Sequence, residues 1–461
     1  MPRLVTLLRI ALLIMFVCMW YSLKYPELPT KMPEPCWRPP GLLNRAANNV
    51  ITEFNDDFER KFLDSIDDLK SRLRNTRDFQ PPLTRVGWEY GISSKYLKKV
   101  IHHWLHNYDF EGRMQRMNQF PQFKVNVQGL DIVYHHVRPE NPENKPVVPL
   151  LLLHGWPSNI YEFTKIYPML TTPRPDYPFV FEVIAPNLPG FAFSSPATIK
   201  GLGTPQIAVV MKNFMKSIGY YSYYVHGSDW GAMIGADMGS LYNEHVRGLH
   251  SSLCIVPSFT TYLLLTLGSI APTLIASEEE YPLMYPLKDH LYRLFDESGY
   301  FHFQATKPDV IGILLADSPA GLAAYILDKY SAITHHHKRH LEDGGLTEAY
   351  DLDDLLDTLT INWIANSTLS SARIYSEGFN KEWYDKGIMK IAIRAPTACV
   401  HFPHDVYYMP PCLLKYRFRN LIRSTIMPRG GHFPWLEEPK LFTDDIWASI
   451  DIMEVERHKN K

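Results

Sequence analysis

The pentapeptide Gly227-Ser228-Asp229-Trp230-Gly231 decides the fold, because it stands between a short apolar run and a stretch of small residues. The apolar run covers residues 221–225, and the small residues follow as Ala232, Gly235, Ala236 and Gly239. A Gly-x-nucleophile-x-Gly sequence in this setting is typical of the sharp strand-to-helix turn that lifts a side chain into a cleft. Asp229 stands at its apex, so the expected nucleophile is a carboxylate.

A carboxylate at this apex indicates a particular chemistry. It can displace at a saturated carbon and leave an ester, and water can then attack the carbonyl carbon of that ester and restore the carboxylate. Ser228 lies off the apex, which disfavours a serine esterase. We therefore expect a substrate with an electrophilic sp³ carbon, such as an epoxide or an alkyl halide. The simpler alternative is a glycine-rich turn in which Asp229 only caps the helix.

Hydrolysis of such an ester needs a general base and a carboxylate that orients it, in the chain order nucleophile, acid, histidine. His432 follows the last predicted strand, within Arg429-Gly430-Gly431-His432-Phe433, and is the expected base. Asp405 follows the preceding strand and is the expected acid. Asp444 and Asp445 come after His432 and break the order.

The other histidines have weaker placements. Residues 335–337 are three histidines in a charged segment, which indicates a solvated loop more than a metal site. His102, His103 and His106 fall on a predicted helix far from any strand end. We therefore expect neither a metal ion nor a cofactor.

Two backbone N–H groups are the expected donors to the oxyanion that forms when water adds to the ester. One belongs to Trp230, directly after the nucleophile. The other belongs to Trp156, in His154-Gly155-Trp156-Pro157, since Pro157 has no N–H to offer.

Short apolar runs alternate with loops and plausible helices from residue 147 onward, at 147–153, 179–184, 221–225, 396–402 and 424–428. Continuous apolar strands alternating with helices indicate a mostly parallel sheet covered on both faces. Residues 257–370 interrupt this alternation of strands and helices and are helical in character. We therefore predict an α/β-hydrolase fold whose core (146–256 and 371–461) carries a helical cap (257–370).

The first 145 residues are organised differently. Residues 4–23 are nearly all apolar and long enough to span a bilayer, which predicts a membrane anchor over residues 1–24. A cleavable signal peptide is disfavoured, because no small-x-small cleavage site follows. Residues 25–145 are expected to hold a proline-rich linker (25–40), helices over 54–77 and 94–108 in a helical meander, and a hairpin within 123–137 that turns at Gly129.

Composition adds few constraints. The net charge of −2 over 461 residues gives no reason to expect nucleic acid as a partner. The five cysteines, an odd number without a CxxC pair, favour free thiols over a disulfide framework. Aromatic residues make up 13% of the chain, which suits an apolar binding cavity but also a large core.

The motifs at 154–157, 227–231 and 430–433 together resemble those of microsomal epoxide hydrolases and insect juvenile hormone epoxide hydrolases. The resemblance runs from the predicted anchor to the last helix. It implies hydrolysis of a small apolar epoxide to a trans-diol through an aspartyl ester. It also implies an endoplasmic reticulum protein held in lipid by a single N-terminal segment. Xenobiotic epoxides and juvenile hormone are both open as substrates, as are the membrane orientation and the oligomeric state.

The resemblance further implies two cap tyrosines that donate to the epoxide oxygen, at the positions of Tyr300 and Tyr375. Phenols are protonated at neutral pH and can supply the proton that an opening alkoxide needs. Many members carry glutamate where this chain has Asp405. We expect the role to be kept, with a changed rate of ester hydrolysis.

Two alternatives from other classes remain. A haloalkane dehalogenase would share Asp229 and His432, and the side chains of Trp156 and Trp230 could bind halide. A non-catalytic lipid-binding or hormone-binding protein on the same scaffold would normally lack one member of the triad, whereas all three candidates are present here.

Overall fold

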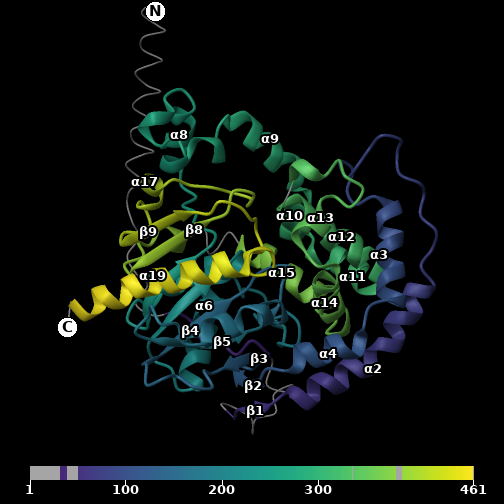
Figure 1. The fold of residues 1–461 in the computed structure, drawn as a ribbon, viewed down its shortest axis with the longest axis horizontal. Coiled ribbons are helices and arrows are strands. Elements are labelled where there is room, and N and C mark those ends of the chain that lie inside the picture. Colours follow the sequence, from purple (N-terminus) through teal and green to yellow (C-terminus); the bar gives the residue numbers. More distant parts are fainter. Residues whose placement is uncertain (1–31, 39–49, 335, 380–386, 460–461) are drawn as a thin grey trace, which may run out of the picture.

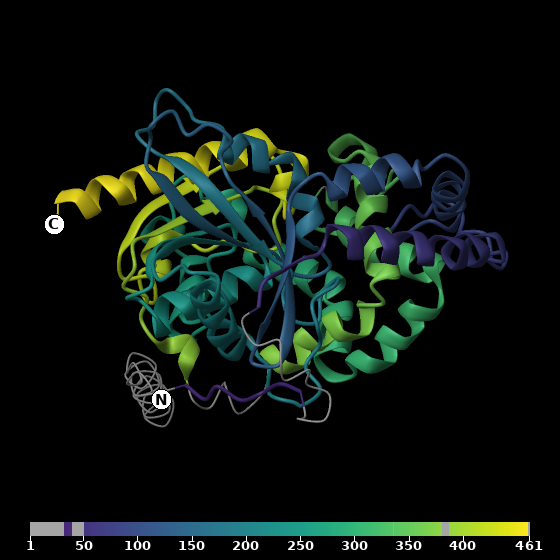
Figure 2. The same ribbon diagram turned by 90° about the horizontal axis from the view of Figure 1, so that it is seen from below.

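The computed structural model describes residues 32–38, 50–334, 336–379 and 387–459. A nine-stranded sheet lies at the centre, in the order β1-β2-β3-β5-β4-β6-β7-β8-β9 (Figures 1 and 2). The pairs β1–β2, β2–β3 and β3–β5 are antiparallel, and every later pair is parallel. The strands are β1 (Thr52–Glu53), β2 (Gln122–Val127), β3 (Leu130–Val137), β4 (Val147–Leu153), β5 (Val180–Pro186), β6 (Tyr223–Gly227), β7 (Val246–Ser251), β8 (Thr397–His401) and β9 (Leu421–Ile426).

Both faces of the sheet are covered, and this explains the continuous apolar strands. Along β4, Leu150 and Leu152 belong to one hydrophobic core, whereas Leu151 and Leu153 belong to another. The core helices are α5 (Tyr167–Thr171), α6 (Thr204–Ser217), α7 (Trp230–Leu241), α17 (Pro411–Leu414), α18 (Pro434–Glu437) and α19 (Pro439–Lys459). The mostly parallel α/β-hydrolase sheet predicted from the sequence is confirmed.

A run of helices separates β7 from β8 and lies beside the sheet (Figure 1). These helices are α8 (Phe259–Gly268), α9 (Leu287–Glu297), α10 (Gly299–Thr306), α11 (Pro308–Asp317), α12 (Pro319–Ala332), α13 (Leu346–Ala349), α14 (Leu352–Ile364) and α15 (Thr368–Gly378). We call them the cap.

The N-terminal helices α2 (Asn55–Arg74), α3 (Ser94–His106) and α4 (Phe110–Asn118) pack against cap helices α12 and α14 (Figure 1). The indole Nε1 of Trp104 donates to Thr360 at 3.0 Å, and the Tyr108 hydroxyl donates to Asp357 at 2.7 Å. The N-terminal segment therefore supports the cap from outside.

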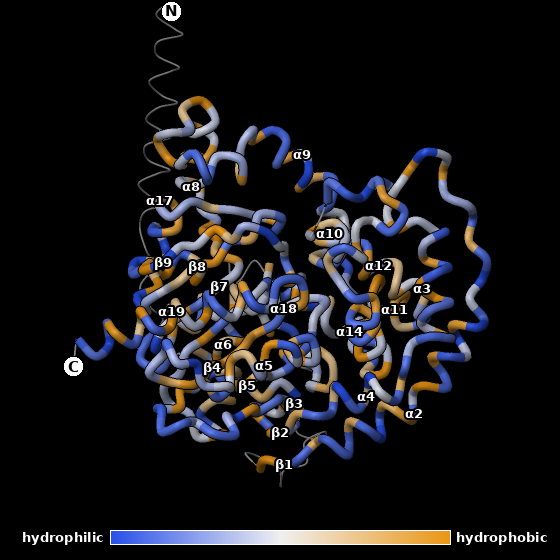
Figure 3. Tube along the Cα trace, viewed as in Figure 1, coloured by the Kyte–Doolittle hydropathy of each residue, from blue (hydrophilic) through white to orange (hydrophobic). Residues whose placement is uncertain are grey.

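The predicted amphipathic helix is α2, along which hydrophilic and hydrophobic residues alternate (Figure 3). Its buried side chains repeat every three or four residues, as a helix with one buried face requires: Phe58, Phe62, Ile66, Leu69 and Leu73. The helix at 94–108 and the hairpin around Gly129 are also present, as α3 and as β2–β3.

Strand β7 was not predicted from the sequence. Its sequence, Val-Arg-Gly-Leu-His-Ser, has too few apolar residues to look like a buried strand. His250 and Ser251 are nevertheless buried, and His250 bonds to Asp445 of α19 at 3.0 Å. A strand whose polar groups find partners inside the protein has no hydrophobic signature.

The predicted anchor at residues 4–23 lies outside the described residues. No helix in the described ranges is both long enough and apolar enough to cross a membrane. The described part of the predicted linker, residues 32–38, lies against the protein body. There Trp37 is buried, its N–H donates to the Gln128 carbonyl at 2.9 Å, and its carbonyl accepts from Thr198 at 3.0 Å.

The prediction of free thiols is wrong for two cysteines, because Cys254 and Cys399 form a disulfide with a Cα–Cα distance of 6.0 Å. Cys254 follows β7 and Cys399 lies in the neighbouring parallel strand β8, so the sheet brings the two residues together. They are 145 residues apart in the chain, a separation at which spacing alone reveals nothing. Cys36 and Cys412 are free, and Cys18 lies outside the described residues.

Candidate active site

The turn between β6 and α7 has the geometry of a nucleophile elbow. Asp229 adopts φ 50° and ψ −126°, a conformation that costs free energy and is found mostly at functional sites. A Cβ on Gly227 would lie 2.2 Å from the Gly231 carbonyl oxygen, so only glycine fits that tight bend. The Asp229 side chain makes no capping bond to α7, and this excludes the capping alternative.

Ser228 points away from the cleft, as its place in the motif predicts. Its hydroxyl is buried, contacts the Nε2 atom of His226 at 2.8 Å, and accepts from Ser252 at 2.8 Å. A serine held in this way is not available to a substrate above the sheet.

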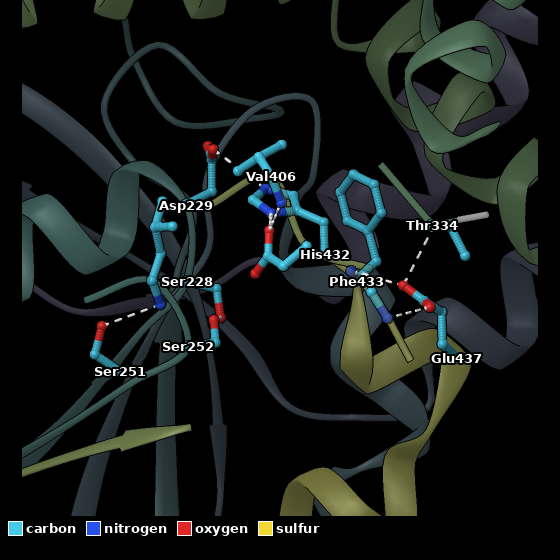
Figure 4. A network of polar contacts seen from close by, with 12 residues as sticks. Ser228, Asp229, Ser251, Ser252, Thr334, Val406, His432, Phe433 and Glu437 are labelled. Carbon is cyan, nitrogen blue, oxygen red and sulfur yellow. Dashed lines mark hydrogen bonds and ion pairs between the residues drawn. The ribbon is translucent and has the colours of Figure 1, made fainter. Parts of the chain in front are cut away.

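His432 lies between two carboxylates (Figure 4). Its Nδ1 is 2.6 Å from Oδ1 of Asp405, and its Nε2 is 3.3 Å from Oδ2 of Asp229. The sequence-predicted residues of the triad therefore meet, in the order expected. The short side chain of Asp405 reaches the imidazole.

The loop that carries Asp405 is fixed from two directions. Oδ1 of Asp405 also accepts the N–H of Val406 at 2.6 Å. From the cap, the guanidinium of Arg293 donates to the carbonyl oxygens of Asp405 and Val406 at 3.2 and 3.3 Å. These contacts aim the carboxylate of Asp405 at the imidazole.

The two carboxylates determine the charge of His432. Burial disfavours the imidazolium, but the charge of Asp405 and the hydrogen bonds to Asp229 and Asp405 outweigh burial and raise the pKa of His432 to about 10. The resting site therefore contains an imidazolium between two carboxylates. Loss of the charge on Asp229 would remove part of this stabilisation and lower the pKa of His432.

The N–H of Trp156 donates to Oδ1 of Asp229 at 2.7 Å, so one predicted oxyanion donor already contacts the carboxyl group. A Cβ on Gly155 would lie 2.1 Å from the same oxygen, and this explains the glycine before Trp156. Trp230, which carries the second predicted donor, is the first residue of α7 and directly follows Asp229.

The two cap tyrosines meet above the nucleophile. The ring of Tyr300 stacks on Trp156 with centroids 5.5 Å apart, and the ring of Tyr375 meets Trp230 edge-on at 4.9 Å. Burial and the charge of Asp229 raise the pKa of Tyr300, and a hydrogen bond with Tyr375 offsets only part of this rise. Burial, followed by Tyr300 and Asp229, raises the pKa of Tyr375 as well. Both phenols are therefore protonated at neutral pH.

A cavity of about 250 Å³ opens onto these groups. Asp229, Tyr300 and Tyr375 lie on its wall, and most of the remaining lining is apolar or aromatic: Trp230, Met233, Leu253, Ile255, Leu294, Phe301, Ala332, Ile333, Phe379, Val406 and Tyr407. An apolar cavity with a few convergent polar groups fits a small hydrophobic ligand.

Two buried or partly buried glutamates that join the cap to the core were not predicted from the sequence. Glu162 accepts from Tyr330 and Thr358 of the cap and from Trp435, at 2.7–2.8 Å. Glu437 lies beside the histidine loop. Burial raises its pKa to about 7, although hydrogen bonds from backbone N–H groups partly offset this effect. Neither belongs to a motif, so nothing in the sequence distinguishes them from surface acids.

The remaining candidate groups lie elsewhere. His102, His103 and His106 are on α3. Asp444 pairs with Arg174, and Asp445 pairs with His250 and Arg423. Within the described residues, no group of three or more His, Cys, Asp or Glu side chains is arranged to hold a metal ion. His335 lies outside those residues.

Sequence comparisons agree with this geometry. The family model described as epoxide hydrolase N terminus matches residues 51–163, and that of the α/β hydrolase fold matches residues 148–262. Juvenile hormone epoxide hydrolase 2 of Ctenocephalides felis is 43% identical over 393 residues, which cover 85% of this chain and 84% of the relative. Epoxide hydrolase 1 of Oryctolagus cuniculus is 36% identical over 449 residues, covering 95% and 97%.

A comparison of structures gives the same result. The crystal structure of juvenile hormone epoxide hydrolase from Bombyx mori superposes with a TM-score of 0.87 at 38% identity. The match covers 92% of this chain and 99% of that one.

Proposed function

This chain belongs to the epoxide hydrolase family, and on that premise we propose that it opens epoxides through a covalent ester on Asp229. The mechanism is supported by two contacts, from Asp405 to His432 and from His432 to Asp229. Asp229 in turn lines an apolar cavity.

In the first step, a carboxylate oxygen of Asp229 attacks one carbon of the epoxide, and the carbon–oxygen bond of the ring breaks. The departing oxygen takes a proton from Tyr300 or Tyr375, whose phenols border the cavity. Attack from the face opposite the leaving oxygen inverts the carbon, so a cyclic epoxide yields a trans-diol.

The second step begins with the loss of charge on Asp229. Because the ester is neutral, the pKa of His432 falls, the imidazolium gives up a proton, and the tyrosine can recover the one it lost. The neutral imidazole then takes a proton from water, and the resulting hydroxide adds to the carbonyl carbon of the ester. Asp405 stabilises the imidazolium that forms.

The tetrahedral oxyanion requires donors, which the backbone supplies. The N–H of Trp156 already donates to Oδ1 of Asp229, and the N–H of Trp230 follows the nucleophile directly. When the intermediate collapses, the ester bond breaks and the diol leaves with a proton from His432. The carboxylic acid left on Asp229 then passes its own proton to His432, which restores the carboxylate and the imidazolium.

Trapping the ester tests this mechanism. We expect His432→Gln to form the ester and to hydrolyse it hardly at all, because the general base is gone. Mass spectrometry of the variant incubated with an epoxide should show the mass gain of one substrate on the peptide that contains Asp229. Asp229→Asn should give neither the adduct nor the diol. An unmodified peptide in the histidine variant would contradict the covalent step.

We propose juvenile hormone as the preferred substrate over xenobiotic epoxides. Relatives named juvenile hormone epoxide hydrolase share 39–43% of their residues with this chain, compared with 36% for epoxide hydrolase 1 of two mammals. The apolar lining of the cavity suits a terpenoid chain.

A turnover panel separates these substrates and also tests the dehalogenase alternative. We expect kcat/KM to be at least about 10-fold higher for juvenile hormone than for styrene oxide, about 1.4 kcal/mol in transition-state binding. An alkyl bromide should release no bromide, because the proposed proton donors Tyr300 and Tyr375 suit a leaving oxygen that needs a proton. A reversed order would refute the hormone assignment, and bromide release would favour the dehalogenase.

We propose that residues 4–23 anchor the enzyme in the endoplasmic reticulum membrane. The support is the apolar run itself, which is long enough to span a bilayer. After alkaline carbonate extraction, the full chain should stay in the membrane pellet, whereas a chain that begins at residue 25 should move to the supernatant. A full chain found in the supernatant would refute the anchor.

A further inference from the structure

The loop that carries His432 is held by one carboxylate, that of Glu437 at the end of α18. Oε2 of Glu437 accepts the N–H of Gly431 at 2.6 Å, and Oε1 accepts the N–H of Phe433 at 2.9 Å (Figure 4). These are the residues directly before and after His432. One side chain therefore fixes the backbone on both sides of the base.

The same carboxylate reaches the cap. Oε1 of Glu437 accepts the Tyr350 hydroxyl at 3.0 Å and the Thr334 hydroxyl at 3.5 Å, and those two hydroxyls also contact each other. The N–H of His432 itself donates to the carbonyl of Ile333 at 3.2 Å, just beyond the C-terminal end of α12. The histidine loop is thus bonded to core and cap at once.

Only a carboxylate satisfies this arrangement. Every group that faces Glu437 in these contacts can donate a hydrogen, and a carboxylate accepts through both of its oxygens. A glutamine would place its own N–H₂ group against one of the two backbone N–H groups, which would leave that donor without a partner.

We propose that Glu437 is a positioning residue for the hydrolytic step, holding the His432 imidazole at the angle from which it activates water; this rests on the proposed function. Alkylation of Asp229 depends on the nucleophile and the phenols, and it needs no proton transfer to His432. Hydrolysis depends on the direction of Nε2 of His432. The two steps should therefore respond differently when Glu437 is changed.

Single-turnover kinetics of Glu437→Gln test the proposal, with Glu438→Gln as the matched control. Glu438 is the next residue, and its carboxylate pairs with the side chain of Arg429, which is 65% exposed, instead of with the backbone N–H groups on either side of His432. We expect Glu437→Gln to slow hydrolysis of the ester on the order of 100-fold, since a small misplacement of a catalytic group has effects of that size. The rate of ester formation in the same variant should change by less than about 3-fold. Glu438→Gln should behave as wild type in both steps.

Equal slowing of both steps, or hydrolysis at the wild-type rate, would overturn the proposal. If Glu437→Gln does not fold, Tyr350→Phe decides, because it removes a single hydroxyl from the carboxylate. It should slow hydrolysis by about 3- to 10-fold and leave ester formation unchanged, as expected for one lost hydrogen bond. Unchanged hydrolysis in Tyr350→Phe would then overturn the proposal. A wild-type enzyme that forms no ester would refute the proposed function itself, so the two failures are distinguishable.

Discussion

An imidazole held between two carboxylates is the interaction on which the rest of the site depends. Asp405 fixes Nδ1 of His432 at 2.6 Å, and Asp229 lies 3.3 Å from Nε2, so both negative charges favour the imidazolium. In the proposed mechanism the same contact also sets the order of the two steps, because conversion of Asp229 to a neutral ester removes one of the two charges. His432 can then act as a base only after the ester exists.

The cap contributes more to this site than a lid would. It supplies the phenols of Tyr300 and Tyr375, and its Arg293 bonds to the backbone of the loop that carries Asp405. Glu162 and Glu437 each join the cap to the core. Because a misplaced base loses much of its effect, we expect these contacts to matter for the rate of the reaction. The N-terminal helices in turn support the cap through contacts such as Trp104 with Thr360.

The sequence predicts features that depend on local pattern or on a strict motif. The elbow at Asp229, the loop at His432 and the apolar strands all have such signatures, because a glycine bend and a fully buried strand restrict the residues that fit. Strand β7 has no such pattern, since its buried His250 is satisfied by Asp445 across the fold. The Cys254–Cys399 bond and the contact of Glu437 with Tyr350 are likewise set by tertiary packing. The positions of Tyr300 and Tyr375 came from resemblance, because 27 tyrosines give no local signal.

The charge on Asp229 is expected to keep His432 protonated, and the titration of that one imidazole tests this most directly. Nitrogen-15 NMR of histidine-labelled protein, with the resonance assigned from a His432→Gln sample, reports the charge of the ring across pH. We predict an imidazolium that persists through neutral pH and titrates near pH 10 in the wild type. In Asp229→Asn, which mimics the neutral ester, the same ring should titrate at a clearly lower pH. A pKa near the ordinary histidine value of about 6.5 in both proteins would contradict the account.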